Sequence, residues 1–146
     1  MTTERRRGRV GMPLDRLLMP RHLFDVMIDE LLRASPNEGC GIIATTGERA
    51  VRLYPGTNVE ASAVRYLMDP VEVVTALLDI ESRGWCMGAT YHSHPAGPAW
   101  PSATDLREAY YPEALTVIVS LARAEPRAGA FALGAGTPRA VPFVID

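Results

Sequence analysis

The segment from Leu115 to Leu121 is almost entirely apolar and rich in β-branched residues. A strand of this composition is buried on both faces, so it belongs at the centre of a sheet that other elements cover on either side. Helical and strand-like patterns interleave along the rest of the chain. The sequence therefore predicts an α/β fold, in which a single domain contains a mixed β-sheet flanked by helices.

Two long helices are predicted. In the first, which Pro20 opens, the apolar residues form one helical face made of Leu23, Phe24, Met27, Ile28, Leu31 and Leu32. The second begins with Asp69 as its N-cap and Pro70 at its first helical position, and Gly84 follows its end. Its core face is predicted to be Val73, Val74, Leu77 and Leu78.

The remaining elements are short. Strands are predicted at 14–19, 38–46, 49–54, 64–68 and 85–91, a short helix at 102–111, and closing strands at 131–133 and 141–145. The chain has 146 residues, enough for one domain with its own core. We expect residues 1–13 to be a flexible N-terminal tail and residues 14–146 to form the domain.

Charge and composition exclude several classes of protein. The net charge of −2 does not indicate a basic surface for nucleic acid. No apolar run approaches the ~20 residues that span a bilayer, and no apolar segment follows the N-terminal arginines as in a secretory signal. Cys40 and Cys86 lie in apolar runs, which favours buried free thiols and a cytoplasmic location.

Four residues predict a metal site. His92 and His94 are two apart at the end of a buried strand, so both imidazoles point to the same face. Ser102 and Asp105 are three apart at the start of a helix and also share a face. Two imidazoles and one carboxylate that converge, with one position left open, are typical of catalytic zinc.

Each half of this pattern has a simpler interpretation. A His-x-His pair often lies at a surface without a metal, and Ser102-x-x-Asp105 is also a helix-capping signal. The whole string, His-x-His-Pro-x6-Ser-x-x-Asp, is far rarer by chance. Hydrolysis also needs a base, for which Glu38 is the candidate. Spacing alone does not place Glu38 near the histidines.

Glu38 together with His92-Ser93-His94-Pro95, six further residues and Ser102-Ala103-Thr104-Asp105 resembles the complete signature of the JAMM (MPN+) zinc metalloproteases. The resemblance covers roughly residues 15–146. It implies the MPN fold, which is related to that of the cytidine deaminases. The short chain is most similar to compact bacterial members that act on small ubiquitin-like or sulfur-carrier β-grasp proteins.

The resemblance also implies roles. His92, His94 and Asp105 would bind Zn²⁺, Glu38 would take a proton from water, and Ser102 would donate a hydrogen bond to the oxyanion. The scissile bond would follow a C-terminal Gly-Gly, either in conjugates to target lysines or in the carrier itself. Residues 64–69 and the loop 96–101, with Trp100, are candidate lining for the substrate.

Other interpretations stay open or are disfavoured by the residues. Relatives without the metal site serve as non-catalytic scaffolds or binding modules, and they typically lack some of the residues present here. A zinc deaminase is disfavoured, because its H-x-E and P-C-x-x-C motifs are absent. The sheet edges and the arginine-rich tail would allow a homodimer, which nothing in the sequence decides.

Overall fold

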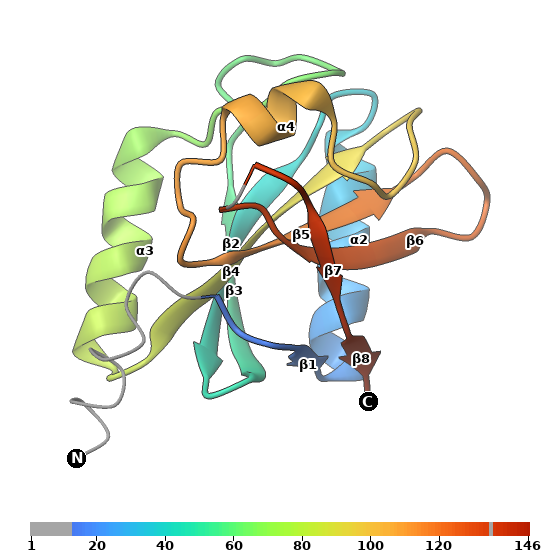
Figure 1. The fold of residues 1–146 in the computed structure, drawn as a ribbon. Helices are drawn as coiled ribbons and strands as arrows, with labels where there is room; N and C mark the ends of the chain where they lie inside the picture. The colour runs from blue at the N-terminus through green and yellow to red at the C-terminus, as the bar shows by residue number, and fades with distance from the viewer. Residues whose placement is uncertain (1–12, 135) are drawn as a thin grey trace.

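The computed structural model describes residues 13–134 and 136–146 (Figure 1). The predicted tail, residues 1–13, lies outside the described residues apart from Pro13. A mixed sheet of eight strands has the order β7-β6-β5-β4-β2-β3-β1-β8. Its strands are β1 (Leu17–Met19), β2 (Cys40–Thr46), β3 (Arg49–Gly56), β4 (Cys86–His94), β5 (Leu115–Ser120), β6 (Arg127–Ala132), β7 (Arg139–Val141) and β8 (Phe143–Ile145).

Within the described ranges, three helices cover this sheet. Helix α2 (Arg21–Ala34) lies on one face, while α3 (Pro70–Ser82) and the short α4 (Ala103–Arg107) lie on the other (Figure 1). Strand β4 pairs antiparallel with β2 and parallel with β5, and α4 lies on the connection from β4 to β5. The predicted fold class, a mixed sheet flanked by helices, is confirmed.

The alternation of side chains along the strands divides the core between the two faces. On the α2 face, Tyr91 of β4 and Val117 of β5 pack in one cluster with Met27 and Leu31 of the helix. On the opposite face, Ile42 of β2 packs with residues of α3, and Ile118 of β5 packs near α4. Strand β5 is therefore buried on both sides, as its composition predicts.

The same alternation positions the polar end of β4. Ala89 and Tyr91 belong to the α2 face. Because successive side chains of a strand point to opposite faces, Thr90, His92 and His94 point to the face that carries α3 and α4. The two histidines are the last residues of β4 on this face, directly before the loop that leads to α4.

Several local predictions are confirmed. Asp69 caps α3 by accepting a hydrogen bond from the amide of Val71, and Pro70 is the first residue of the helix. Gly84 has a φ of 72°, a left-handed conformation that suits glycine after a helix. Both cysteines are free thiols, with Cys40 buried and Cys86 partly exposed. Apart from these predictions, the described part of the chain has no helix that is long and apolar enough to cross a membrane.

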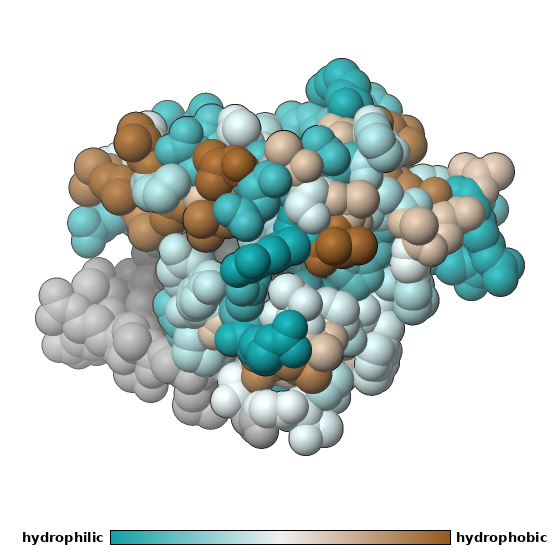
Figure 2. Space-filling model, turned by 90° about the horizontal axis from the view of Figure 1, so that it is seen from above, coloured by the Kyte–Doolittle hydropathy of each residue, from teal (hydrophilic) through white to brown (hydrophobic). Residues whose placement is uncertain are grey.

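Other local predictions were wrong. Residues 64–68 are not a strand: the segment between β3 and α3 has only an isolated bridge that joins Asn58 to Met68. On α3, Val74 and Leu78 are 56% and 63% exposed, because Ala76 and Ile80 supply the buried contacts instead. Figure 2 shows hydrophobic residues gathered on the side of the molecule where α3 lies. On α2, Leu32 is likewise half exposed.

Candidate metal centre and active site

Three predicted ligand side chains converge on one point beside α4. The Nε2 atoms of His92 and His94 are 3.2 Å apart. The two oxygens of Asp105 lie 3.1 Å from Nε2 of His92 and 3.0 Å from Nε2 of His94. A tetrahedral metal with bonds of about 2.0–2.1 Å separates its ligand atoms by about 3.3 Å. The donor spacing therefore fits one metal ion.

A hydrogen bond to the backbone fixes which nitrogen of His94 faces this point. Nδ1 of His94 lies 2.7 Å from the carbonyl oxygen of Pro98, which only accepts, so Nδ1 carries the proton. In the neutral ring, Nε2 then presents its lone pair to an Asp105 oxygen at 3.0 Å. Two facing lone pairs repel unless a proton or a metal ion lies between them, and a metal ion would bind to both.

The charges of the three groups suit a cation. Burial opposes ionisation of Asp105, but hydrogen bonds with the two histidines hold the pKa of this carboxyl well below its usual range. Burial lowers the pKa of His92, which keeps its ring neutral. The pKa of His94 is also lowered by burial, yet the hydrogen bonds to Asp105 and Pro98 raise it overall. A metal binds to a carboxylate and to neutral imidazoles, so a bound ion would replace the proton that the raised pKa favours on His94.

Helix α4 positions Asp105 through a capping box. The hydroxyl of Ser102 accepts a hydrogen bond from the amide of Asp105 at 3.0 Å, and the carboxylate of Asp105 accepts from the amide of Ser102 at 2.9 Å. Both bonds of the predicted cap are therefore present. The cap uses an oxygen lone pair of Ser102, so its hydroxyl proton stays available to a further acceptor.

Glu38 is brought to the site by the pairing of β2 with β4. Cys40 lies opposite His92 in this ladder. Beyond the last paired residues, the hydroxyl of Ser93 accepts from the amide of Gly39 at 2.9 Å, and the amide of Ser93 donates to the carbonyl of Gly39 at 3.0 Å. These bonds extend the alignment so that Glu38 lies at the level of the two histidines.

The carboxyl group of Glu38 is buried and has an oxygen without a hydrogen bond among the described residues. Its residue is 4% exposed, and its Oε1 has no hydrogen-bond partner among the described residues. Burial raises its pKa to about 7; His94 lowers the pKa and Asp105 raises it. A group with this pKa takes and releases a proton near neutral pH.

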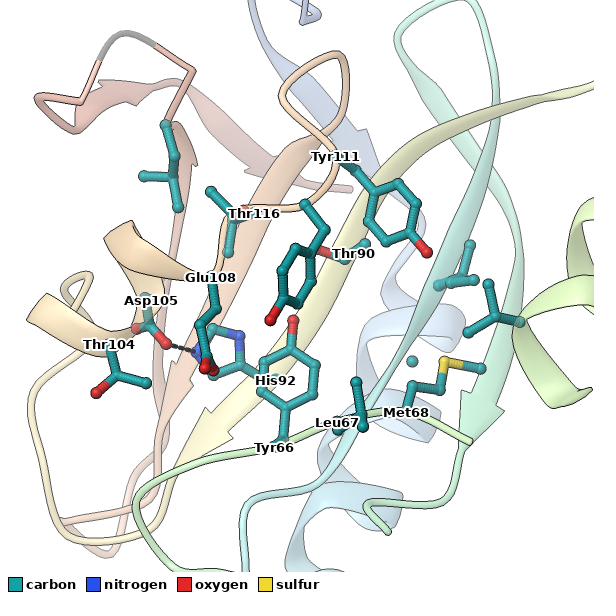
Figure 3. Close-up of a pocket in the computed structure, with 16 residues that line it drawn as sticks. Tyr66, Leu67, Met68, Thr90, His92, Thr104, Asp105, Glu108, Tyr111 and Thr116 are labelled. Carbon is teal, nitrogen blue, oxygen red and sulfur yellow. Dashed lines mark ion pairs between the residues drawn. The ribbon is translucent and has the colours of Figure 1, made fainter. Parts of the chain in front are cut away.

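A pocket opens beside His92. One wall is the segment Tyr66–Met68, and the opposite wall is α4 with the residues after it, from Thr104 to Tyr111. Figure 3 shows His92 between Asp105 on one side and Tyr66 on the other. The ring of Tyr66 stacks on that of His92 with centroids 4.7 Å apart. Nδ1 of His92 has no hydrogen-bond partner among the described residues.

The predicted substrate-lining segments separate into two groups. Within residues 64–69, Tyr66, Leu67 and Met68 line this pocket. The loop 96–101 does not line it and borders a separate groove with Arg123 and Arg127. Trp100 is half exposed and packs edge-on against Phe131, with ring centroids 5.1 Å apart.

Sequence reasoning missed three supporting residues. Ser93 was only the x of the His-x-His motif, Tyr66 was only one residue of the candidate lining 64–69, and Asn58 had no predicted role. Each acts through a neighbour that is distant in the chain: Gly39, His92 and Glu38 respectively. A polar residue at a predicted buried position, as at Ser93, was the one local signal available.

Residues 20–132 match a family model described as prokaryotic homologs of the JAB domain. The chain is 44% identical over 95 residues to a Thermus thermophilus protein named "Probable TtuB-protein conjugate cleaving protease". This match covers 64% of the chain and 63% of that relative, less than two thirds of its length. A Mycobacterium tuberculosis protein named "CysO-cysteine peptidase" is 34% identical over 106 residues, covering 71% of the chain and 73% of the relative.

Solved structures agree. A solution structure from Desulfitobacterium hafniense superimposes with a TM-score of 0.81 at 32% identity, covering 89% of this chain and 92% of the other. A JAB1/MPN domain protein from Archaeoglobus fulgidus has a TM-score of 0.57 at 17% identity, with 88% and 99% covered, which shows a shared fold. With its matching residues, its sheet order and its cluster of metal-binding donors, this chain belongs to the family of prokaryotic homologs of the JAB domain.

Proposed function

We propose that this chain is a zinc-dependent peptidase or isopeptidase that cleaves after the C-terminal Gly-Gly of a ubiquitin-like or sulfur-carrier β-grasp protein. The observation that carries the proposal is the buried carboxyl of Glu38, whose Oε1 has no hydrogen-bond partner among the described residues, together with three converging donors that could hold a metal. The names of relatives support it: one is named "Probable TtuB-protein conjugate cleaving protease", one "CysO-cysteine peptidase", and one from Haloferax volcanii "Desampylase".

His92, His94 and Asp105 would hold the zinc ion, which leaves its fourth position open to water or substrate. When bound, zinc supplies Lewis-acid activation of that water and of the scissile carbonyl. The capping box and the Pro98 carbonyl keep the donor atoms aimed at one point before any metal arrives. Such alignment reduces the cost of binding and favours one geometry.

Glu38 would be the general base and then the general acid. Its free Oε1 accepts the proton of the attacking water, and the same carboxyl gives it to the leaving amine. Because burial raises its pKa to about 7, both transfers are accessible near neutral pH. Ser102 would donate its hydroxyl proton to the developing oxyanion while its oxygen still caps α4.

The substrate's glycine tail would approach along the pocket beside His92. Glycines have no side chains to clash in a narrow passage, and the mostly exposed segment 59–67 lines this pocket with Tyr66 and Leu67. Two jobs remain within this proposal. One is removal of the modifier from target lysines, and the other is processing of the carrier or release of an amino acid built on it.

The second candidate, a non-catalytic scaffold, is disfavoured because all the donor side chains and Glu38 are present. We further propose residues 14–146 as the catalytic domain. The free thiols of Cys40 and Cys86 support a reducing compartment such as the cytoplasm. A homodimer stays a prediction that light scattering would test.

The test is a cleavage assay on a small β-grasp carrier extended past its Gly-Gly by a peptide or by a lysine-linked protein. We expect cleavage after the second glycine, which is lost with a chelator and restored by added zinc. Glu38→Gln should bind zinc and leave the carrier intact. Tight, stoichiometric zinc is part of the proposal; a protein that binds no zinc and cleaves neither substrate would favour the scaffold.

A further inference from the structure

The side chain of Asn58 bridges two parts of the site that are not adjacent in sequence. Its Nδ2 donates to the carbonyl of Glu38 at 3.0 Å and to that of Arg65 at 3.1 Å. Its Oδ1 accepts from the amides of Glu60 at 3.0 Å and Leu67 at 3.1 Å. One amide thus uses its donors and its acceptor on four separate backbone groups.

On one side, these bonds hold the backbone of the candidate base. The carbonyl of Glu38 is bound by Asn58, and the amide of Glu38 donates to the carbonyl of Ser62 at 2.8 Å. Ser62 belongs to the same segment, and its carbonyl also lies 3.5 Å from Nδ2 of Asn58. Both backbone groups of Glu38 are therefore tied to the segment that Asn58 organises.

The other hydrogen bonds of Asn58 hold the segment Tyr66–Met68, the pocket wall that packs on His92. Arg65 and Leu67, the two backbone partners of Asn58 here, flank Tyr66. The ring of Tyr66 stacks on His92. Figure 3 shows Tyr66 and Leu67 on the segment that passes in front of His92. The position of this ring thus depends on Asn58.

No regular ladder substitutes for these bonds. Between β3 and α3 the described chain has only the bridge of Asn58 with Met68, so side-chain hydrogen bonds define the course of the segment. Backbone groups without a ladder must find other partners, and a residue that satisfies four of them fixes the segment's shape.

We propose that Asn58 is a positioning residue for the hydrolysis, one that keeps Glu38 and the Tyr66 wall at a fixed separation across the metal centre. The inference rests on the proposed function. Asn58 touches neither the metal donors' binding atoms nor Oε1 of Glu38, so it acts through its neighbours. Small misplacements of reacting groups cost up to about 10²-fold in rate, so its loss falls mainly on kcat.

Two variants distinguish the donors of the Asn58 side-chain amide from its acceptor. Asn58→Asp keeps an acceptor for the amides of Glu60 and Leu67 but loses the donors to the carbonyls of Glu38 and Arg65, whereas Asn58→Ala loses the acceptor as well. The matched control is Asn37→Ala, which changes the residue directly before Glu38. Among the described residues, Asn37 forms a hydrogen bond through its backbone amide, to the carbonyl of Ala34, and none through its side chain. Wild type and Glu38→Gln are assayed beside them on the extended β-grasp carrier.

With zinc content measured in every sample, we expect kcat per zinc-loaded molecule to fall about 10–100-fold in Asn58→Ala and to change less than 2-fold in Asn37→Ala. Amide hydrogen exchange on the metal-free protein is the second readout. Exchange at Glu38 should speed up at least 10-fold in both Asn58 variants, and exchange at Leu67 only in Asn58→Ala.

The outcomes are distinct. A normal kcat per zinc in Asn58→Ala, with only a lower melting temperature, would overturn the positioning role and leave a structural one. Unchanged exchange at Glu38 in both variants would also overturn it. If Asn58→Ala does not fold, Asn58→Asp decides by the same criteria. Failure of wild type to cleave any carrier would instead remove the proposed function itself.

Discussion

Cys40 of β2 lies directly opposite His92 of β4, and this one pairing sets the geometry of the site. Directly opposed residues in an antiparallel pair project to the same face of the sheet. Glu38 lies two residues before Cys40 and His94 two residues after His92, so all four side chains share the face that carries α4. A slip of one residue would turn Glu38 to the α2 face and separate it from the histidines.

Removal of one metal donor should release the metal. We expect His94→Ala to lose stoichiometric zinc and all cleavage, because two remaining side chains seldom hold the ion. Metal analysis after dialysis, together with the carrier assay, checks this. The control is His22→Ala, which changes an exposed residue of α2 away from the site and should retain both. Stoichiometric zinc in His94→Ala would show that another residue completes the centre.

The buried carboxyl of Glu38 should make the metal-free protein less stable as pH rises. Its pKa is raised from the ordinary 4.5 to about 7 in the folded state, so the folded protein binds more protons than the unfolded chain between these values. The contribution of Glu38 to the free energy of unfolding therefore falls as pH rises from about 4.5 to 7. Since one pKa unit is about 1.4 kcal/mol, the loss is of order 1–3 kcal/mol.

Glu38→Gln should remove that dependence. In the presence of a chelator, we expect the variant to match wild type at pH 4 and to be more stable at pH 8, measured by urea denaturation. Glu81→Gln, which changes an exposed residue of α3, is the control. It should show no such pH-dependent difference from wild type in the free energy of unfolding. Equal stability of Glu38→Gln and wild type at pH 8 would mean that the carboxyl is solvated in the folded protein.

Loss of the Ser102 hydroxyl should affect rate and stability together. Ser102→Ala removes the cap on Asp105 and should cost about 0.5–2 kcal/mol of unfolding free energy. It also removes the proposed oxyanion donor, which is typically worth about 10²–10³-fold in kcat. Ser102→Thr keeps a hydroxyl and should recover most of both. A kcat in Ser102→Ala within a few-fold of wild type would leave the hydroxyl only its capping role.

Chelation should inhibit without unfolding. The apolar core on both faces of the sheet does not include the metal donors, and a chain of this size supports its own fold. We expect circular dichroism to stay native after chelation, the melting temperature to fall by a modest amount, and added zinc to restore activity. Loss of the native spectrum on chelation would show that the metal also holds the fold together.

The features predictable from the sequence are those that short-range geometry fixes. Residues two apart on a strand share a face, which predicted the convergence of His92 and His94. Residues three apart on a helix share a face and a cap, which predicted the pairing of Ser102 with Asp105. The Pro70 start of α3, the glycine after its end and the central position of β5 are equally local signals.

Which distant segments come into contact depends on how the whole chain packs. The apolar pattern of 64–68 predicted a strand, but the segment has no neighbouring strand to complete a ladder and instead follows the hydrogen bonds of Asn58. Val74 and Leu78 have the spacing of a core face, yet the sheet contacts α3 through Ala76 and Ile80. Periodicity in the sequence indicates that one face of a helix is apolar, but it does not indicate which other element packs on that face.

The placement of Glu38 is the sharpest case. Nothing within several residues of Glu38 specifies a partner 54 or more residues away. Its position follows from the β2–β4 register, from the hydroxyl of Ser93 and from the side chain of Asn58. Pairing between strands and side-chain hydrogen bonds across the chain are set by the packing of the whole sheet, because each depends on groups that only folding brings together.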